Sequence, residues 1–346
     1  MSTPSRPSLV RHWLALAEEL VGRAAPRLDA LNLFPVPDAD TGTNMLATLT
    51  AARTAADACP AQDDAGAVLA HAGAAALDSA RGNSGMLLAV SLAGMAEPLR
   101  GRERVDAFAL AAAFGAADRA ARQALSDPRE GTILTVLSAA ARSLARSSTQ
   151  APDTPAVAGD ADPAVRLGPA VTVMLADCVQ AVEETESLLA PLTRAHVVDA
   201  GAVGLLWVFE ALRSVVTGTP VDEELATALP GYGEGAHAAE GEPAAAAEAP
   251  AEGAVEVMGT LALTPLAAAE LRRRLTDVGD AVILAPVGTA RDAQGRVPWR
   301  VHVHVPRAED AIGPLRAAGD VEGLAVTDLA EPSHGDDAAP DGCHGR

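Results

Sequence analysis

Two aspartates, Asp38 and Asp40, stand two residues apart in the segment FPVPDADTGTNM at 34–45. Two carboxylates this close in the chain can hold a hard divalent cation, because Mg²⁺ and Ca²⁺ prefer oxygen ligands. An EF-hand calcium loop starting at Asp38 would need Gly at its sixth position and Glu at its twelfth. Thr43 and Leu49 stand there instead. The pattern therefore excludes an EF-hand and favours magnesium.

The alternative is a solvated turn that caps the next helix, since Asp and Thr are ordinary N-cap residues. The context favours a site, because Pro35 and Pro37 stiffen the approach and Gly42 permits a sharp exit into a helix starting near Thr43. Carboxylates beside a helix N-terminus combine a Mg²⁺ site with backbone amides aimed at anionic oxygens. Asn32 can supply a third oxygen ligand.

Three further loops have the composition of phosphate- or nucleotide-binding turns at helix starts: SARGNSG (79–85), REGTILTVL (129–137) and HVVDAGAVGLL (196–206). Each is weak alone, because Gly at a helix boundary is usually only a turn. If the helix starts converge on one end of an antiparallel bundle, the loops form a single site. The candidate residues are Gly82, Asn83, Ser84, Gly85, Gly131, Thr132, Asp199 and Gly201.

His302 and His304 form a separate candidate pair in WRVHVHVP. Residues two apart in a strand point to the same face, so both imidazoles can meet one metal ion, partner or phosphoryl group. An exposed pair on a sheet surface would show the same spacing.

Long alanine-rich segments must position the four motifs. Helical periodicity and the near-absence of β-branched runs predict helices over 8–31, 44–58, 65–80, 85–99, 104–125, 130–148, 167–190 and 201–217. The Gly-, Pro-, Ala- and Glu-rich stretch 218–253 is typical of a flexible linker. Beyond it, three short β-like runs and two helical segments predict a small α/β domain at 254–331, followed by a disordered tail at 332–346. The fold class is thus mainly α.

The net charge of the chain excludes some classes of binding partner. The chain of 346 residues has a formal net charge of −20 and contains no lysine. Phosphate backbones and anionic lipid surfaces repel such a chain, so we expect no nucleic-acid partner and no binding to a membrane surface. No run of about 18 apolar residues free of charge is found, so we expect no integral membrane segment. Mechanisms that need a lysine are excluded, and metal ions become the obvious means of neutralising a triphosphate. Three cysteines without close spacing fit a reduced, cytoplasmic setting.

The segments FPVPDADTGTNM, ARGNSG, EGTILTV and VVDAGAVGLL, in this order and spacing, resemble the nucleotide-binding L-type domain of dihydroxyacetone kinases. They resemble the ATP-binding subunit of bacterial fatty-acid kinase more closely. The resemblance covers about residues 9–217 and, more weakly, the α/β region, which looks like that subunit's middle domain. It implies an eight-helix antiparallel barrel that binds Mg-ATP at one end.

The resemblance also implies roles for residues. Asp38 and Asp40 match the metal-binding carboxylates, with Asn32 where dihydroxyacetone kinases have a third aspartate. The motif residues Thr41, Thr43 and Asn44 belong to the nucleotide site. Three departures stand out: Ala39 replaces a family glycine, DAGAVG replaces DAGGKG and so lacks its lysine, and Glu256 stands where the family's histidine cluster has a cysteine.

The expected function is a kinase subunit that uses ATP and Mg²⁺ to phosphorylate a fatty-acid carboxylate carried by a separate acyl-binding protein. Asp38, Asp40, His302 and His304 would be its catalytic residues, and a homodimer is compatible with this role. Two alternatives remain open: a dihydroxyacetone (glycerone) kinase subunit, and a nucleotide-binding regulatory protein with reduced catalysis.

Overall fold

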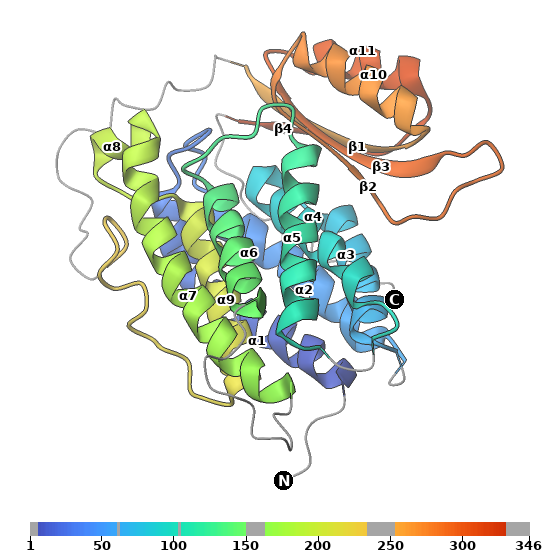
Figure 1. The fold of residues 1–346 in the computed structure, drawn as a ribbon. Coiled ribbons are helices and arrows are strands. Elements are labelled where there is room, and N and C mark those ends of the chain that lie inside the picture. Colours follow the sequence, from blue (N-terminus) through green and yellow to red (C-terminus); the bar gives the residue numbers. More distant parts are fainter. Residues whose placement is uncertain (1–5, 61–62, 103–104, 150–162, 234–252, 330–346) are drawn as a thin grey trace, which may run out of the picture.

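A computed structural model describes residues 6–60, 63–102, 105–149, 163–233 and 253–329. The expected tail at 332–346 and part of the expected linker, 234–252, lie outside the described residues. The first part of the chain is helical and the last part forms a four-stranded sheet with two helices (Figure 1). The predicted fold class, mainly α with a small α/β domain, is confirmed.

Eight long helices and one short helix make up the first part. They are α1 (Arg6–Leu31), α2 (Thr41–Ala58), α3 (Ala65–Ser79), α4 (Gly82–Leu99), α5 (Ala107–Ala124), α6 (Ile133–Thr149), α7 (Pro163–Leu188), α8 (Ala190–Ala195) and α9 (Ala200–Thr217). Five helices start earlier than predicted: α1, α2, α4, α7 and α9 begin at 6, 41, 82, 163 and 200 rather than at 8, 44, 85, 167 and 201.

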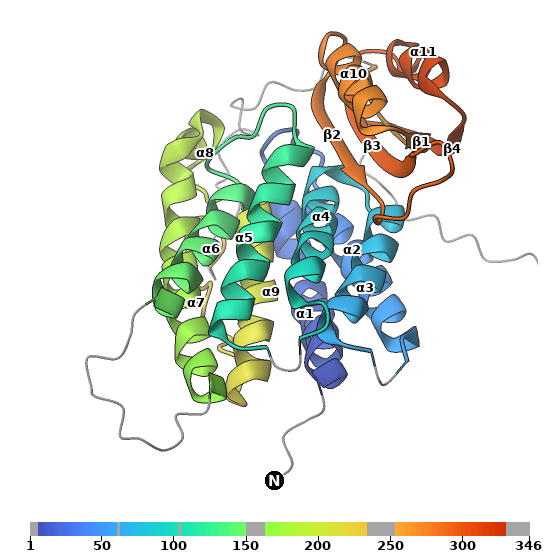
Figure 2. The same cartoon turned by 45° about the vertical axis from the view of Figure 1, so that its right-hand side comes forward.

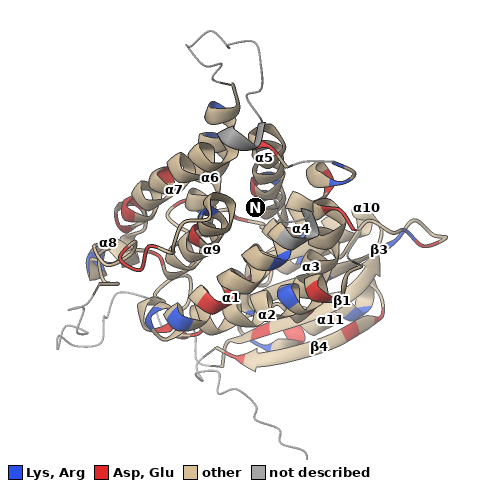
Figure 3. Ribbon diagram, turned by 90° about the horizontal axis from the view of Figure 1, so that it is seen from below, with Lys and Arg blue, Asp and Glu red and all other residues tan. Residues whose placement is uncertain are grey.

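The long helices form a closed antiparallel ring. Each of α1 to α7 contacts the next, α7 contacts α9, and α9 returns to α1. Figure 3 shows the ring with its helices nearly end-on. Small residues allow close approach: a Cβ added at Gly73 of α3 would stand 2.6 Å from the Cα of Ala93 in α4. The abundant alanine thus gives tightly packed helices rather than a core of large side chains.

Helix α9 is the most apolar part of this ring. It is the one described helix that is long and apolar enough to cross a membrane, but 72% of that segment is buried inside the protein. Its Trp207 and Phe209 are almost fully buried in the barrel core. The helix is therefore accounted for as a core element.

The second part consists of β1 (Val255–Leu263), α10 (Pro265–Thr276), β2 (Asp280–Pro286), β3 (Val297–Val305), α11 (Ala308–Ala318) and β4 (Val321–Asp328). The strands are antiparallel in the order β2-β3-β1-β4, which is the ferredoxin-like split βαβ arrangement. Strand β4 was not predicted. Its exposed, charge-containing sequence lacks the apolar alternation of the other strands.

The two faces of the sheet have different neighbours. Val257, Val301 and Val303 point into the small core beneath α10 and α11. Met258 and Ile283 instead join the core of the helical barrel. Figure 2 shows the sheet lying between its own two helices and one end of the barrel.

The first part of the expected linker is packed against the barrel. Residues 219–233 pack along α9, where Ala226, Leu229 and Tyr232 are almost fully buried. The Trp207 indole Nε1 donates to the Tyr232 hydroxyl at 2.9 Å, and the amide of Val198 donates to the carbonyl of Pro230 at 3.1 Å. The composition of 218–253 concealed these apolar anchors among Gly, Pro and Glu, so flexibility over 218–233 was wrongly predicted.

Candidate functional site

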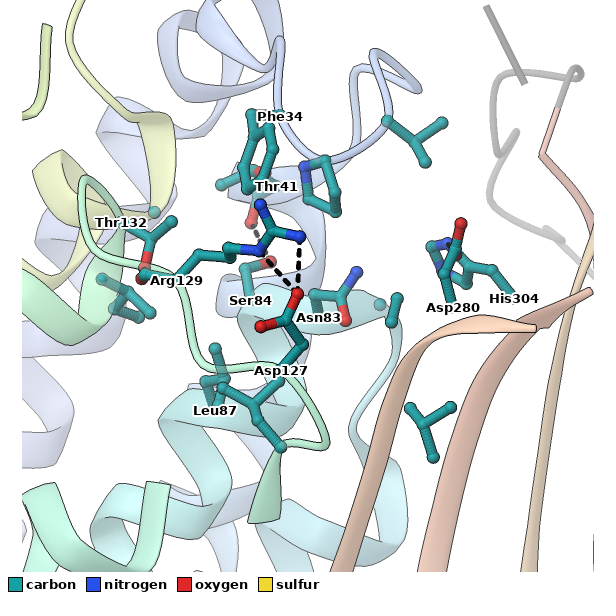
Figure 4. Close-up of a pocket in the computed structure, with 18 of the residues that line it drawn as sticks. Phe34, Thr41, Asn83, Ser84, Leu87, Asp127, Arg129, Thr132, Asp280 and His304 are labelled. Atoms are coloured by element: carbon teal, nitrogen blue, oxygen red, sulfur yellow. Dashed lines mark hydrogen bonds and ion pairs between the residues drawn. The ribbon is translucent and has the colours of Figure 1, made fainter. Parts of the chain in front are cut away.

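Alternate loops of the antiparallel ring meet at the end that faces the sheet. They surround a pocket of about 640 Å³ between the barrel and the sheet (Figure 4), which lies within the 300–1,000 Å³ typical of small-molecule sites. The expectation that the helix starts converge is confirmed. The predicted residues that line the pocket are Asn32, Asp38, Asp40, Thr41, Gly82, Asn83, Ser84, Thr132, Asp199, Gly201 and His304.

The carboxylate pair lies on the barrel side of the pocket. Asn32 donates its side-chain Nδ2 to the Oδ1 of Asp38 at 2.5 Å. Burial, together with the charge of Asp40, raises the pKa of Asp38 to about 8. Burial also raises the pKa of Asp40. Two carboxyls held together away from water disfavour the doubly ionised state unless a cation joins them. The donor set fits Mg²⁺.

Asp29, rather than Asp38 or Asp40, caps the N-terminus of α2. Its Oδ1 accepts from the amides of Gly42 at 2.6 Å and Thr43 at 3.1 Å, and its Oδ2 accepts from the Thr43 hydroxyl at 2.8 Å. The side chain of Asp40, at the N-cap position, makes no capping hydrogen bond to the helix. Asp29 thus caps α2, and the Asp40 carboxylate is not used as the helix cap. These hydrogen bonds occupy the amides of Gly42 and Thr43. Our expectation that the two amides face the anionic oxygens of a ligand is therefore wrong.

The backbone between the two carboxylates is strained. Ala39 has φ = 55°, a left-handed conformation that costs a residue with a Cβ about 1–2 kcal/mol. Glycine adopts this conformation without penalty. The resemblance implies a glycine where this chain has Ala39, and that position is one where the backbone conformation favours glycine.

Five predicted residues do not line the pocket: Thr43, Asn44, Gly85, Gly131 and His302, which is described below. Thr43 is bound to Asp29, and Asn44 is buried below the pocket. A Cβ at Gly85 would lie 2.8 Å from the Thr48 hydroxyl, and one at Gly131 would lie 2.8 Å from Leu188. The two glycines permit close helix and loop packing. Gly85 and Gly131 therefore belong to the motifs because of helix and loop packing around the site, and not because they line the pocket.

The remaining helix starts supply polar side chains to the pocket. The Ser84 hydroxyl donates to the carbonyl of Thr41 at 3.4 Å. Asp199 caps α9 by accepting from the amide of Ala202 at 2.8 Å. It also accepts from the backbone of Ile133 at the start of α6, and burial raises its pKa to about 7. Asp199 thereby ties two helix starts together at the pocket floor.

The sheet provides the opposite wall. Glu256 on β1 pairs in register with His304 on β3, which pairs with Asp280 on β2. Glu256 accepts a hydrogen bond from the backbone of Gly82, at the start of α4, and burial together with the charge of Asp38 raises its pKa. The sheet cluster and the barrel carboxylates therefore belong to one site.

Glu256, His302 and His304 form a group of three potential metal ligands whose donor atoms lie within 4.8 Å of one another. The His302 and His304 rings are 4.8 Å apart. Both nitrogens of His302 and Nδ1 of His304 are buried without a hydrogen-bond partner among the described residues. Burial lowers the pKa of each histidine to about 3, so both are neutral at pH 7. Neutral imidazoles and a carboxylate fit a metal such as zinc.

The burial of His302 and His304 rules out the alternative that they form an exposed pair on a sheet surface. The histidines are 0% and 6% exposed, so they are not on an open sheet face. A partner protein cannot touch them while the sheet covers the barrel end.

A second group of metal-ligand type, Cys59, Asp63 and His71, lies at the opposite end of α2. Here His71 Nδ1 already contacts the carbonyl of Ala67 at 2.9 Å, and the Cys59 thiol contacts the carbonyl of Ala55 at 3.3 Å. Its side chains are partly or fully exposed. It lacks the buried, unpartnered donors of the first group.

Sequence analysis missed several residues of the pocket. Asp280 comes from β2, and Asp127 and Arg129 come from the α5–α6 loop. Phe34 also lines the pocket and lies near Thr41 (Figure 4). The absence of lysine was a signal that could have drawn attention to Arg129, since arginine is then the cation available to an anionic ligand.

The DAK2 domain family matches residues 35–214, which is 180 of the 346 residues. Protein YloV of Bacillus subtilis is 33% identical over 211 residues, which cover 61% of this chain and 35% of the relative. An uncharacterized protein of Staphylococcus haemolyticus is 32% identical over 198 residues, covering 57% and 33%. The chain thus spans about a third of the length of these relatives.

The crystal structure of the dihydroxyacetone kinase from C. freundii in complex with AMP-PNP and Mg²⁺ superposes with a TM-score of 0.42 at 18% identity. The match covers 62% of this chain and 35% of that one.

Proposed function

This chain belongs to the DAK2 domain family, and we propose that it is the nucleotide-binding subunit of a kinase that uses Mg-ATP. The observation that carries the proposal is the carboxylate pair. Asp38 and Asp40 are held together in a pocket between barrel and sheet, and because Asp29 caps α2, neither carboxylate is needed as a helix cap. A solvated turn would not have this arrangement.

Phosphoryl transfer depends chiefly on positioning and on neutralising charge. Asp38 and Asp40, with Asn32, would hold Mg²⁺, which supplies charge neutralisation to the phosphates when it is bound. Asn83, Ser84 and Thr132 offer side-chain hydrogen bonds from two helix starts. Transfer breaks the bond from the γ-phosphorus to its bridging oxygen, forms one to the acceptor oxygen, and releases ADP.

The test is thermal unfolding of the full chain with Mg-ATP. Ligand at 100 times its dissociation constant stabilises the folded state by about 2.7 kcal/mol, so Tm should rise. ATP with excess chelator should raise it far less. Asp38→Asn and Asp40→Asn should abolish most of the Mg-ATP shift and leave the metal-free protein folded. An undiminished shift in both variants would refute the metal assignment.

For the acceptor we favour a fatty-acid carboxylate presented by a separate acyl-binding protein, as the motif resemblance implies. The chain should form no acyl phosphate from ATP and free fatty acid, and addition of the acyl-binding partner should start turnover, measured by trapping with hydroxylamine. Phosphorylation of dihydroxyacetone with a ketone-binding subunit, and none of the acyl protein, would favour the glycerone kinase alternative. ATP binding without either turnover would favour a regulatory role.

The sheet cluster adds a second metal site to this proposal. Glu256, His302 and His304 would hold a metal that ties β1 and β3 together beside the carboxylate pair. Such an ion would reinforce the pocket wall from the sheet side.

A further inference from the structure

Charge in the pocket is strongly unbalanced. Five aspartates line it: Asp38, Asp40, Asp127, Asp199 and Asp280. Within the described part of the chain, Arg129 is the only arginine among the lining residues, and the sequence has no lysine. Any polyphosphate in this pocket has one protein cation within its walls.

Arg129 extends over the pocket from the α5–α6 loop toward the side of Phe34 and Ser84 (Figure 4). Its Nε and Nη2 both lie 2.6 Å from Oδ2 of Asp127. The two side chains are 62% and 66% exposed. Exposed pairs contribute little to stability, so this ion pair can exchange partners at little cost to the fold.

The backbone that carries Arg129 is, by contrast, firmly held. The amide of Ser126 donates to the carbonyl of Val282 on β2 at 3.0 Å, and Leu125 forms a β-bridge with Ile283. On the other side, the Thr132 hydroxyl donates to the carbonyl of Arg129 at 2.9 Å. The sheet and the start of α6 thus fix a loop whose arginine remains free to turn.

We propose that Arg129 binds the terminal phosphates of the nucleotide, and that Asp127 is the partner it leaves when they arrive. This inference rests on the proposed function. A guanidinium matches phosphate oxygens with two parallel hydrogen bonds, and it adds a fixed positive charge where Mg²⁺ alone would face five carboxylates. Asp127 competes with phosphate for the same donors, so the two residues act on affinity with opposite signs.

The opposite signs give the test. Isothermal titration with Mg-ATP should show about tenfold weaker binding for Arg129→Gln, consistent with loss of a charge-assisted contact. Adenosine, which has no phosphates, should bind this variant and the wild type alike. Asp127→Asn should bind Mg-ATP roughly two- to fivefold more tightly, because it removes the competing acceptor and a repelling charge. Arg316→Gln removes the same charge from the exposed face of α11 and should change nothing.

Three results would overturn the inference. If Arg129→Gln binds Mg-ATP with wild-type affinity, the role of Arg129 is wrong, but the proposed function still stands. Equal weakening in Arg129→Gln and Asp127→Asn would show that the pair only shapes the loop. Absence of Mg-ATP binding by the wild-type chain would overturn the proposed function and this inference with it.

Discussion

The two walls of the pocket differ in how they are built. The barrel wall carries Asp38 and Asp40 on a short loop whose residues are consecutive in the chain. The sheet wall carries Asp280 and His304 on different strands, and its place depends on the docking of the sheet by Met258 and Ile283. The carboxylate pair of the barrel wall is thus a local motif, whereas the position of the sheet wall is a product of tertiary packing. Substitutions should affect the walls differently.

The largest expected effect concerns docking. Ile283 on β2 is fully buried in the barrel core. Leu315 on α11 is fully buried in the small core on the other side of the sheet. Alanine at either position should cost about 3 kcal/mol of unfolding free energy. Only Ile283→Ala should also weaken Mg-ATP binding, by roughly fivefold (about 1 kcal/mol), because Leu125 of the Arg129 loop pairs with it. Denaturant unfolding and titration measure both quantities. Equal Mg-ATP affinity in the two variants would show that docking of the sheet does not contribute to nucleotide binding.

The second prediction compares the two groups of metal-ligand type. Zinc affinity, measured by competition with a chromophoric chelator, should fall at least about 100-fold in His302→Ala, because loss of a ligand exceeds the 10–100-fold typical of outer-shell changes. Cys59→Ser should leave it unchanged, since the donors of that group already contact helix carbonyls. Retention of zinc by His302→Ala would contradict the assignment.

The third prediction uses pH on the barrel wall. The pKa of Asp38 is raised to about 8 by burial and by the charge of Asp40, whereas an unfolded aspartate has a pKa of about 3.9. Between these values the folded state binds more protons, so the free energy of unfolding falls as pH rises. In chelator, Tm should therefore drop by a few degrees between about pH 5 and about pH 8.5, and Asp38→Asn should flatten the drop. Parallel curves for the two proteins would exclude a raised pKa.

The smallest effect is expected at Ala39. Ala39→Gly removes left-handed strain of about 1–2 kcal/mol but increases the entropy of the unfolded chain by roughly 0.5–1 kcal/mol. The free energy of unfolding should rise by up to about 1.5 kcal/mol, with no change in the packing of the sheet wall. A destabilised variant would show that the loop does not keep this conformation.

The sequence predicted the barrel wall well for a physical reason. Spacing of apolar residues sets the helices, antiparallel connection brings alternate loops together, and the DADTG motif is contiguous. The sheet wall was only partly predictable. The alternation of His302 and His304 places both on one face, but spacing does not say what covers that face. Asp280 carries no motif, because its cross-strand partner His304 is distant in the chain. Arg129 opens the segment REGTILTVL, but that segment does not show that the side chain reaches the pocket.

The cap on α2 determines which ligand the barrel wall attracts. An uncapped helix start presents a partial positive charge, and many phosphate sites use it directly. Here the Asp29 carboxylate sits on the amides of Gly42 and Thr43, so it compensates that charge beside Asp38 and Asp40. The electrostatic potential at the carboxylate pair stays negative, which attracts a divalent cation and repels a bare triphosphate. The nucleotide should therefore enter as its metal complex, or after the metal, rather than before it.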